Sequence, residues 1–362
     1  MADHVLVTMD PRFPHDDVEE LGRRLTASAA LVPGWIPPEV GLLSIRGLLV
    51  SEHVDGFEHV ILPDRNIASR MARVARTGVC EPRDPASKVA LQIMAFAQAM
   101  NIDIDPGVAF HELAHHSGGD DALDELTWFR TADTSNALAW IDLALGRIDR
   151  VDLGAEAALE QIDVSEPPPR WLRNYIVALK IFELELAGGS PIKRIEALLD
   201  WMIDDFILAG PGFLYAARAF ATHNRRSGMM KGIKSADRGR ALDGAKNAAW
   251  DITYLSEFVR RVASSEADGR RYILATADRA LADIALAALL GIDATDDLPS
   301  LDQRLSEWWH PRDAKRIARR YFECVAKVEG RPPRGSDLDH DPISVFIASG
   351  EARIMAWRPS HR

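Results

Sequence analysis

The stretch that decides the fold is Lys246-Asn-Ala-Ala-Trp-Asp-Ile-Thr-Tyr-Leu255, followed after a charged spacer by Tyr272-Ile-Leu-Ala-Thr-Ala-Asp278. The first segment predicts a helix start that carries Asp251. The second predicts a short strand that ends on Thr276 and Asp278. Carboxylates at the ends of such elements are natural positions for a metal site, so the two segments together predict an α/β protein with chemistry at its strand ends.

Length and composition limit the class of protein. The chain has 362 residues, of which 47% are hydrophobic and 27% charged, as in a soluble globular protein of about two domains or one elaborated domain. Only Cys80 and Cys324 are present, so neither a disulfide framework nor a thiolate zinc cluster is expected. With no secretory signal pattern and no apolar run long enough for a membrane span, the sequence predicts a cytoplasmic protein without membrane contact.

The formal net charge of −11 argues against a protein that coats nucleic acid non-specifically. It still permits a local basic groove or an acidic metal site. Residues 225–246 are locally basic, and so is one face of the predicted helical region 301–328, with Arg312, Lys315, Arg316, Arg319 and Arg320.

Along the chain, apolar patterning predicts strands over 4–9, 42–50, 58–62 and 343–348, and helices over 16–30, 67–76, 86–100 and 279–290. Asp64 directly follows the strand 58–62, at the strand end where open α/β sheets collect ligands. The segment Val32 to Pro38 breaks the pattern, and residues 330–341 read as a linker. Residues 121–222 are almost entirely helical and suggest an inserted subdomain.

Four separated acids form the first candidate site: Asp64 after a strand, Glu112 on a helix, Asp251 at a helix start and Asp278 after a strand. Mg²⁺ and Mn²⁺ prefer carboxylate oxygens and water, and a phosphodiester brings its own anionic oxygens to the same ions. Carboxylates from different element ends can therefore hold cations that activate water and stabilise a leaving oxygen. For Asp64 and Asp278 taken singly, the alternative is a helix N-cap without any metal.

These acids resemble the pattern of PIN-like nucleases. Ile61-Leu-Pro-Asp-Arg-Asn-Ile67 is similar to their strand-Asp-x-Asn opening, Pro106–Ala114 to their helix with a central Glu, and Trp250-Asp251 and Thr276-Ala-Asp278 to their third and fourth acids. The resemblance implies a three-layer α/β/α sandwich with a mainly parallel sheet, elaborated by a large helical insertion. It also implies that the four acids bind one or two Mg²⁺ or Mn²⁺ ions, that Asn66 and Thr276 orient the site, and that the reaction is phosphodiester hydrolysis, most often of RNA.

The resemblance covers about half of the chain, so it does not carry substrate specificity. It implies a nuclease domain made of residues 56–120 and 246–292, interrupted by a helical insertion over 121–245. Residues 1–55 would be an N-terminal α/β extension, and residues 293–362 a C-terminal extension of helices and short strands. The expected partner is nucleic acid, RNA first, with Arg65, Lys231, Lys234 and Lys246 as candidates to hold its phosphates. A protein inhibitor and the oligomeric state are left open.

Two other functions compete with the endoribonuclease. His111-Glu-Leu-Ala-His115 fits a zinc-peptidase pattern with two His ligands one turn apart and Glu112 as general base, and Asp121 falls where a third Zn²⁺ ligand is expected. The remaining alternative is a non-catalytic helical interaction protein whose acids only cap helices.

Overall fold

The computed structural model describes residues 9–37, 39–80, 84–152, 163–164, 166–223, 228–289, 300–329 and 342–358. The chain is α/β, with mostly helices and one small sheet. It divides into two compact units, which are described separately. The first unit comprises Met1–Pro167 and Phe258–Ala282, and the second comprises Pro168–Glu257 and Asp283–Arg362.

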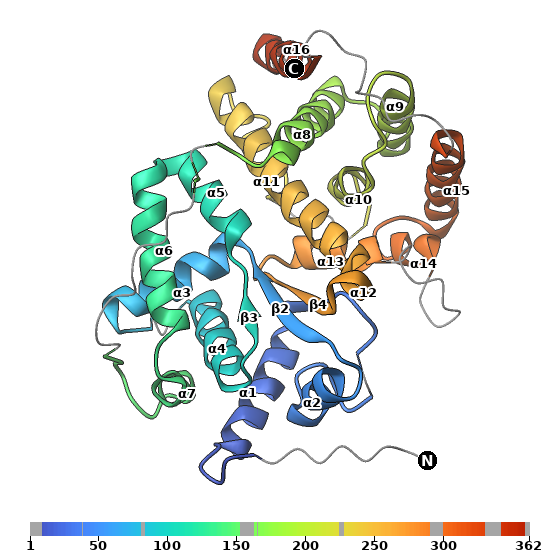
Figure 1. Cartoon of the computed structure of the whole chain (residues 1–362). Coiled ribbons are helices and arrows are strands. Elements are labelled where there is room, and N and C mark those ends of the chain that lie inside the picture. The colour runs from blue at the N-terminus through green and yellow to red at the C-terminus, as the bar shows by residue number, and fades with distance from the viewer. Residues whose placement is uncertain are drawn as a thin grey trace. The chain divides into compact units, whose positions relative to one another are not determined.

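The first unit contains an open sheet of four strands: β1 (Leu31–Pro33), β2 (Glu58–Pro63), β3 (Asp103–Ile104) and β4 (Arg270–Ala275) (Figure 1). Their order is β1-β4-β2-β3. β2 runs parallel to both β3 and β4, whereas β1 is antiparallel to β4, so the sheet is mixed. The carboxyl ends of β2, β3 and β4 therefore lie at the same edge of the sheet.

Both faces of this sheet are buried. Ile61, Ile273 and Ala275 join a core with the helices α1 (His15–Ser28), α3 (Arg65–Thr77), α4 (Pro85–Ala99), α6 (Gly119–Asp133) and α7 (Ala137–Leu145). Val60 and Tyr272, which alternate with those residues, are also buried. Burial on both sides explains why the parallel strands read as continuous apolar runs.

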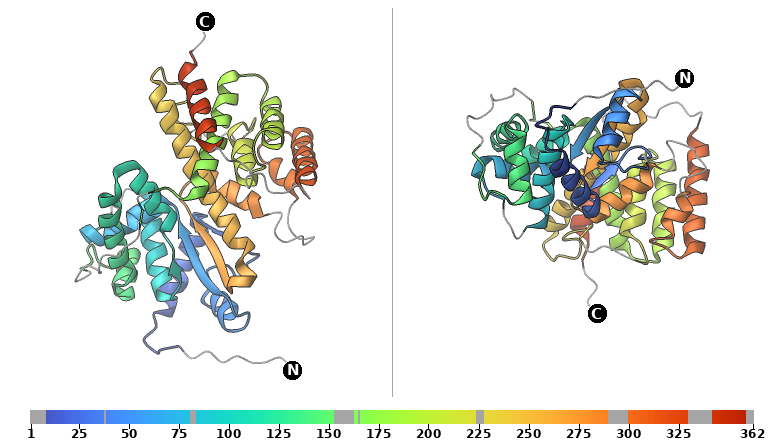
Figure 2. Two further views of the ribbon diagram at one scale, coloured as in Figure 1. Left: turned by 45° about the horizontal axis from the view of Figure 1, so that its top comes forward. Right: turned by 90° about the horizontal axis from the view of Figure 1, so that it is seen from below.

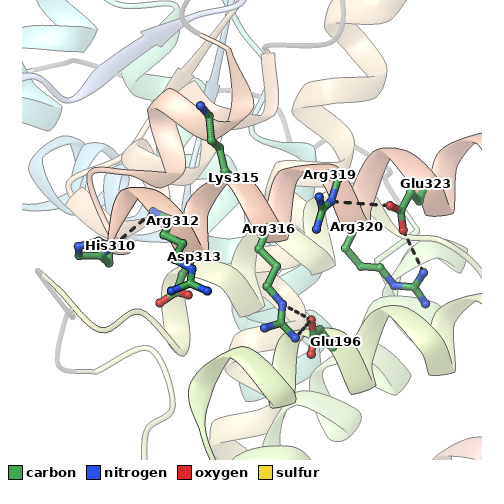
Figure 3. Close-up of a pocket in the computed structure, with 9 residues that line it drawn as sticks. All are labelled: Glu196, His310, Arg312, Asp313, Lys315, Arg316, Arg319, Arg320 and Glu323. Atoms are coloured by element: carbon green, nitrogen blue, oxygen red, sulfur yellow. Dashed lines mark hydrogen bonds and ion pairs between the residues drawn. The ribbon is translucent and has the colours of Figure 1, made fainter.

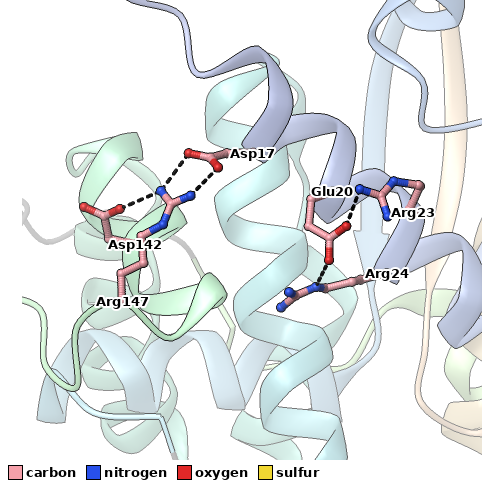
Figure 4. A network of polar contacts seen from close by, with 6 residues as sticks. All are labelled: Asp17, Glu20, Arg23, Arg24, Asp142 and Arg147. Carbon is pink, nitrogen blue, oxygen red and sulfur yellow. Dashed lines mark hydrogen bonds and ion pairs between the residues drawn. The ribbon is translucent and has the colours of Figure 1, made fainter.

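The remaining helices of the first unit are α2 (Ile45–His53), α5 (Gly107–Ser117) and α12 (Ser265–Asp268). An ion-pair network fixes α1 against the end of α7, because the Arg147 guanidinium contacts the carboxylates of both Asp17 and Asp142 (Figure 4). These hydrogen bonds hold the pKa of Asp17 below its ordinary value. The pairs are partly exposed, so they contribute orientation more than stability.

The second unit is helical among its described residues. Its helices are α8 (Pro169–Ala187), α9 (Pro191–Asp204), α10 (Gly210–Ala219), α14 (Leu301–Leu305), α15 (Pro311–Val328) and α16 (Pro342–Ala356), with most of α11 (Arg238–Ala263) and the end of α13 (Arg279–Ala288) (Figure 2). Gly350 lets α16 approach the side chain of Leu179 on α8. Tyr175 donates a hydrogen bond to Glu351 at 2.8 Å and ties the same pair of helices together.

Three local predictions are wrong. Residues 42–50 and 343–348 are predicted to be strands, but 45–50 lie in α2, with 42–44 in the turn before it, and 343–348 lie in α16. Ser44 caps α2 by accepting the N–H of Gly47, and Pro342 occupies the first turn of α16. Both apolar runs are compatible with a helix or a strand, and these helix-starting residues favour the helix. β1 lies where the sequence indicated only a break, and it adds to the sheet through the backbone of Val32.

The predicted strand 4–9 lies outside the described residues except for Met9, and the predicted linker 330–341 lies wholly outside them. The helices α6 and α7 belong to the first unit, although their residues fall in the segment expected to be an insertion. No helix in the described parts of the chain is long and apolar enough to cross a membrane.

Gly244 in the second unit lies so close to a backbone carbonyl that alanine, normally the better helix former, should destabilise the helix there. Gly244 of α11 lies against the backbone carbonyl of Lys231, where an added Cβ would collide. Alanine normally stabilises a helix interior by about 1 kcal/mol relative to glycine. Here Gly244→Ala should lower the free energy of unfolding by about 1–3 kcal/mol, because the segment carrying Lys231 must move away. Urea denaturation measures the change.

Gly239→Ala is the matched control in the first turn of the same helix, where the nearest atom is only the carboxylate of Asp237 at 3.1 Å. A side chain can move where a backbone carbonyl cannot, so this variant should be close to neutral. Equal stability of the two alanine variants would contradict the proposed backbone contact.

Candidate active site at the carboxyl edge of the sheet

Asp64 occupies the junction between β2 and α3. Its backbone N–H donates to the carbonyl of Ala275 at 2.8 Å, which extends the β2–β4 pairing by one residue. Its Oδ1 accepts the N–H of Ile67 at 2.8 Å and so caps α3. The side chain is buried, with 3% of the residue exposed. Asp64 is therefore the N-cap of α3, as the alternative without a metal predicted. This cap places its carboxylate at the carboxyl edge of the sheet.

Thr276 joins Asp64 to Asp278. Its hydroxyl donates to Asp64 Oδ2 at 2.6 Å and accepts the backbone N–H of Asp278 at 3.0 Å. Asp278 itself is exposed, and its Oδ1 accepts the N–H groups of Ala280 and Leu281 in the first turn of α13. The adjacent ends of two parallel strands thus bring these two predicted acids to one place, with the predicted helper Thr276 between them.

The electrostatics of this pair favour a proton on the buried acid. Burial, with a smaller contribution from the negative charge of Asp278, raises the pKa of Asp64 from its ordinary value of 3.8 to about 6. The hydrogen bonds from Thr276 and Ile67 act in the opposite direction, because they stabilise the carboxylate. A carboxyl group at this edge is consequently sensitive to any positive charge that arrives beside it.

Glu112 forms an ion pair with Arg65, the residue that follows Asp64. Glu112 lies on α5, and its Oε1 is 3.8 Å from Arg65 Nη1 and 3.9 Å from His116 Nε2. Its side chain is only 12% exposed. Glu112, the second acid of the predicted set, is therefore paired with the predicted phosphate-binding Arg65. Asn66, predicted to orient the site, is exposed in the first turn of α3, and its carbonyl accepts from Arg70.

One acid at the same edge, Asp105, was not predicted from the sequence. Asp105 follows β3, its N–H donates to the carbonyl of Ile61, and its carboxylate pairs with Arg261 at 2.9 Å. Because β3 is parallel to β2, Asp105 belongs to the same rim as Asp64. The signal was present in the sequence, as an acid between a short alternating segment and Pro106-Gly107.

The placement of Asp251 at a helix start is wrong. α11 runs without interruption from Arg238 to Ala263, so Asp251 lies in its middle, within the second unit. The start is instead at Asp237, whose carboxylate accepts the N–H of Gly239. The alanines at 241, 245, 248 and 249 are strong helix formers and are all buried, which explains the continuity.

The other predicted phosphate-binding residues also belong to the second unit. Lys231 and Lys234 are exposed, and Lys246 is half-buried on α11. Arg238, from the same basic stretch, has a structural role, because its buried guanidinium donates to the backbone carbonyls of Ile233, Ser235 and Ile354.

The predicted zinc motif is distributed over two helices. His111, Glu112 and His115 lie on α5, and Gly118 makes the turn into α6 with φ +102°, but Asp121 is exposed in the first turn of α6. His111 Nδ1 lies 3.1 Å from the carbonyl of Glu166. Within the described parts of the chain, no group of three or more His, Cys, Asp or Glu side chains is placed to hold a metal ion.

The donor set at the sheet edge suits a hard cation in type and number. Proteins bind Mg²⁺ with one or two carboxylates plus water and the phosphate oxygens of a substrate, so Asp64 and Asp278 can form the protein part of such a site. Burial of the Asp64 charge is the main cause of its raised pKa, and a cation beside these carboxylates would offset both that cost and the smaller repulsion from Asp278.

Comparison of the chain with protein-family models, with curated proteins and with solved structures gives no match.

The raised pKa of Asp64 predicts how stability depends on pH. The folded-state pKa lies above the unfolded value, so a stabilising contribution is fully present below about pH 4 and is lost as pH rises through about 6. Two pKa units correspond to about 3 kcal/mol. In Asp64→Asn this contribution is absent. Between pH 4 and pH 7, in a chelator, the variant should gain about 3 kcal/mol of unfolding free energy relative to the original chain. Parallel pH profiles would refute the assignment.

Thr276→Val tests the link between the two acids. The change removes the donor to Asp64 and the acceptor of the Asp278 N–H, both of which are buried or partly buried. We expect a loss of about 1–3 kcal/mol in unfolding free energy and a higher pKa for Asp64, measured by carboxyl ¹³C NMR. Thr276→Ser keeps the hydroxyl and is the control. An unchanged Asp64 pKa in the valine variant would show that the hydroxyl does not govern this carboxylate.

Proposed function

We propose that this chain is a metal-dependent nuclease of the PIN-like type that cleaves RNA, with its active site at the carboxyl edge of β2 and β4. One observation carries the proposal. Asp64 and Asp278 follow adjacent parallel strands and are joined through the Thr276 hydroxyl at 2.6 and 3.0 Å. Open α/β sheets bind their ligands at this edge.

The order of the acids along the edge adds support. Asp278, Asp64 and Asp105 follow three neighbouring strands in the order β4-β2-β3, and Glu112 lies on the helix that begins after β3. The sheet is buried on both faces, which is compatible with the three-layer PIN-like arrangement that the resemblance implies. The role of Glu112 as a further ligand rests on the resemblance.

Each residue has a distinct task in this proposal. Asp64 and Asp278 would hold Mg²⁺ or Mn²⁺, which supplies a Lewis acid that activates water and neutralises charge on the phosphate. Thr276 fixes the Asp64 carboxylate by donating to Oδ2. Arg65 is 34% exposed and paired only loosely with Glu112, so its guanidinium can pair with a phosphate oxygen of the substrate.

Asp278→Asn separates catalysis from capping. Asparagine caps a helix as well as aspartate does, so α13 should remain intact, whereas the charge beside Asp64 is lost. We expect Mn²⁺-dependent cleavage of single-stranded RNA to fall by at least about a hundredfold, equivalent to about 2.7 kcal/mol of transition-state stabilisation. The thermal unfolding midpoint should change little.

Asp237→Asn is the matched control, since Asp237 is also an exposed aspartate that caps a helix. It should retain full cleavage. Undiminished RNA cleavage in the Asp278→Asn protein would overturn the proposal. So would stoichiometric zinc that is lost on His115→Ala, because that result assigns the chain to the zinc-peptidase alternative.

A further inference from the structure

A basic surface of the second unit has no task in the proposed active site. α15 and Glu196 of α9 line a pocket of about 1020 Å³ (Figure 3). Its cations are Arg312, Lys315, Arg316, Arg319 and Arg320, against three carboxylates. We call these five side chains the α15 basic face. Its positive excess opposes the net charge of −11 of the whole chain.

Two members of the α15 basic face have structural partners. Arg316 pairs with Glu196 at 2.6 Å, and Arg320 contacts Asp200 and, at 3.3 Å, Glu323. In Figure 3 these two side chains point toward the helix that carries Glu196. They attach α15 to α9, so their charges are already largely balanced.

The charges of the other three cations are poorly neutralised by nearby carboxylates. Among the described residues, the structure gives no ion pair for the side chains of Arg312 and Lys315, and Arg319 is 76% exposed and 3.9 Å from Glu323. Their spacing of three, four and seven residues places their backbone positions on one side of α15, where positive charge accumulates, although the Lys315 side chain extends away from the other two in Figure 3. Arg312 also lies in the first turn, where the helix dipole disfavours a cation. An anionic ligand would relieve both effects.

We infer that the α15 basic face binds the phosphodiester backbone of single-stranded RNA. The choice of RNA as the anion rests on the proposed nuclease function. Seven residues of helix separate Arg312 from Arg319, about 10 Å along the axis, which is long enough for more than one phosphate. Arginine forks match phosphate oxygens in geometry. The described lining contains no Phe, Tyr or Trp on which a base could stack, so binding is independent of base sequence.

The test measures binding without cleavage. Fluorescence anisotropy of a labelled polyuridine of about 20 nucleotides is followed in a chelator between about 50 and 200 mM salt. The variant Arg312→Gln/Lys315→Gln/Arg319→Gln should bind at least about tenfold more weakly at the lowest salt. Because each phosphate contact to a single strand contributes about 0.7 to the slope of log affinity against log salt, the slope should become shallower by about 2.

The control variant is Arg170→Gln/Lys193→Gln/Lys327→Gln, which removes three exposed cations of the same unit from outside the pocket. Its affinity should change less than twofold. Equal losses in the two triple variants, no loss in either, or displacement of RNA by polyglutamate at matched charge would each overturn the inference.

The RNA-binding role of the α15 basic face and the proposed nuclease activity can be contradicted independently of each other. Retained RNA binding without Mn²⁺-dependent cleavage would support the α15 basic face and contradict the proposed function. Mn²⁺-dependent cleavage, together with RNA binding that the three glutamine substitutions leave unchanged, would support the proposed function and contradict the role of the α15 basic face.

Discussion

The hydrogen bond from the Thr276 hydroxyl to the Asp64 carboxylate is the interaction on which the candidate site depends. It connects the residues that follow two parallel strands separated by about two hundred positions in the chain. The same hydroxyl also accepts the N–H of Asp278. One side chain thereby fixes the position of a buried acid and the path of the backbone toward an exposed one.

A buried carboxylate is costly unless it is compensated, and Asp64 is compensated only in part. Two hydrogen bonds favour its charged form, but burial and the neighbouring Asp278 raise its pKa to about 6. If these acids served only as caps, this repulsion would bring no benefit, because asparagine would cap equally well without it. A cation or a proton beside Asp64 would lower this cost, which is why we propose a binding role for the pair.

The sequence predicted the strands on either side of the site because each combines a short apolar run with an acid at its carboxyl end. Parallel pairing then placed Asp64 and Asp278 together. The prediction from sequence was wrong at residues 42–50 and 343–348, because a short apolar run is compatible with a helix as well as with a strand. There the helix-starting residues Ser44 and Pro342 determine the structure. The prediction also misplaced Asp251, because no breaker interrupts the alanine-rich segment that continues back to Arg238. Asp105 was visible as an acid after a short strand, but a two-residue strand gives little signal.

We propose that Asp64 and Asp278 together bind a hard divalent cation. Electron paramagnetic resonance of Mn²⁺ titrated into the full chain at neutral pH tests this most directly, because it counts bound ions without any substrate. We expect one or two bound Mn²⁺ ions that Mg²⁺ displaces, and loss of at least one ion in Asp64→Asn/Asp278→Asn. Identical Mn²⁺ binding by the original chain and this variant would contradict it.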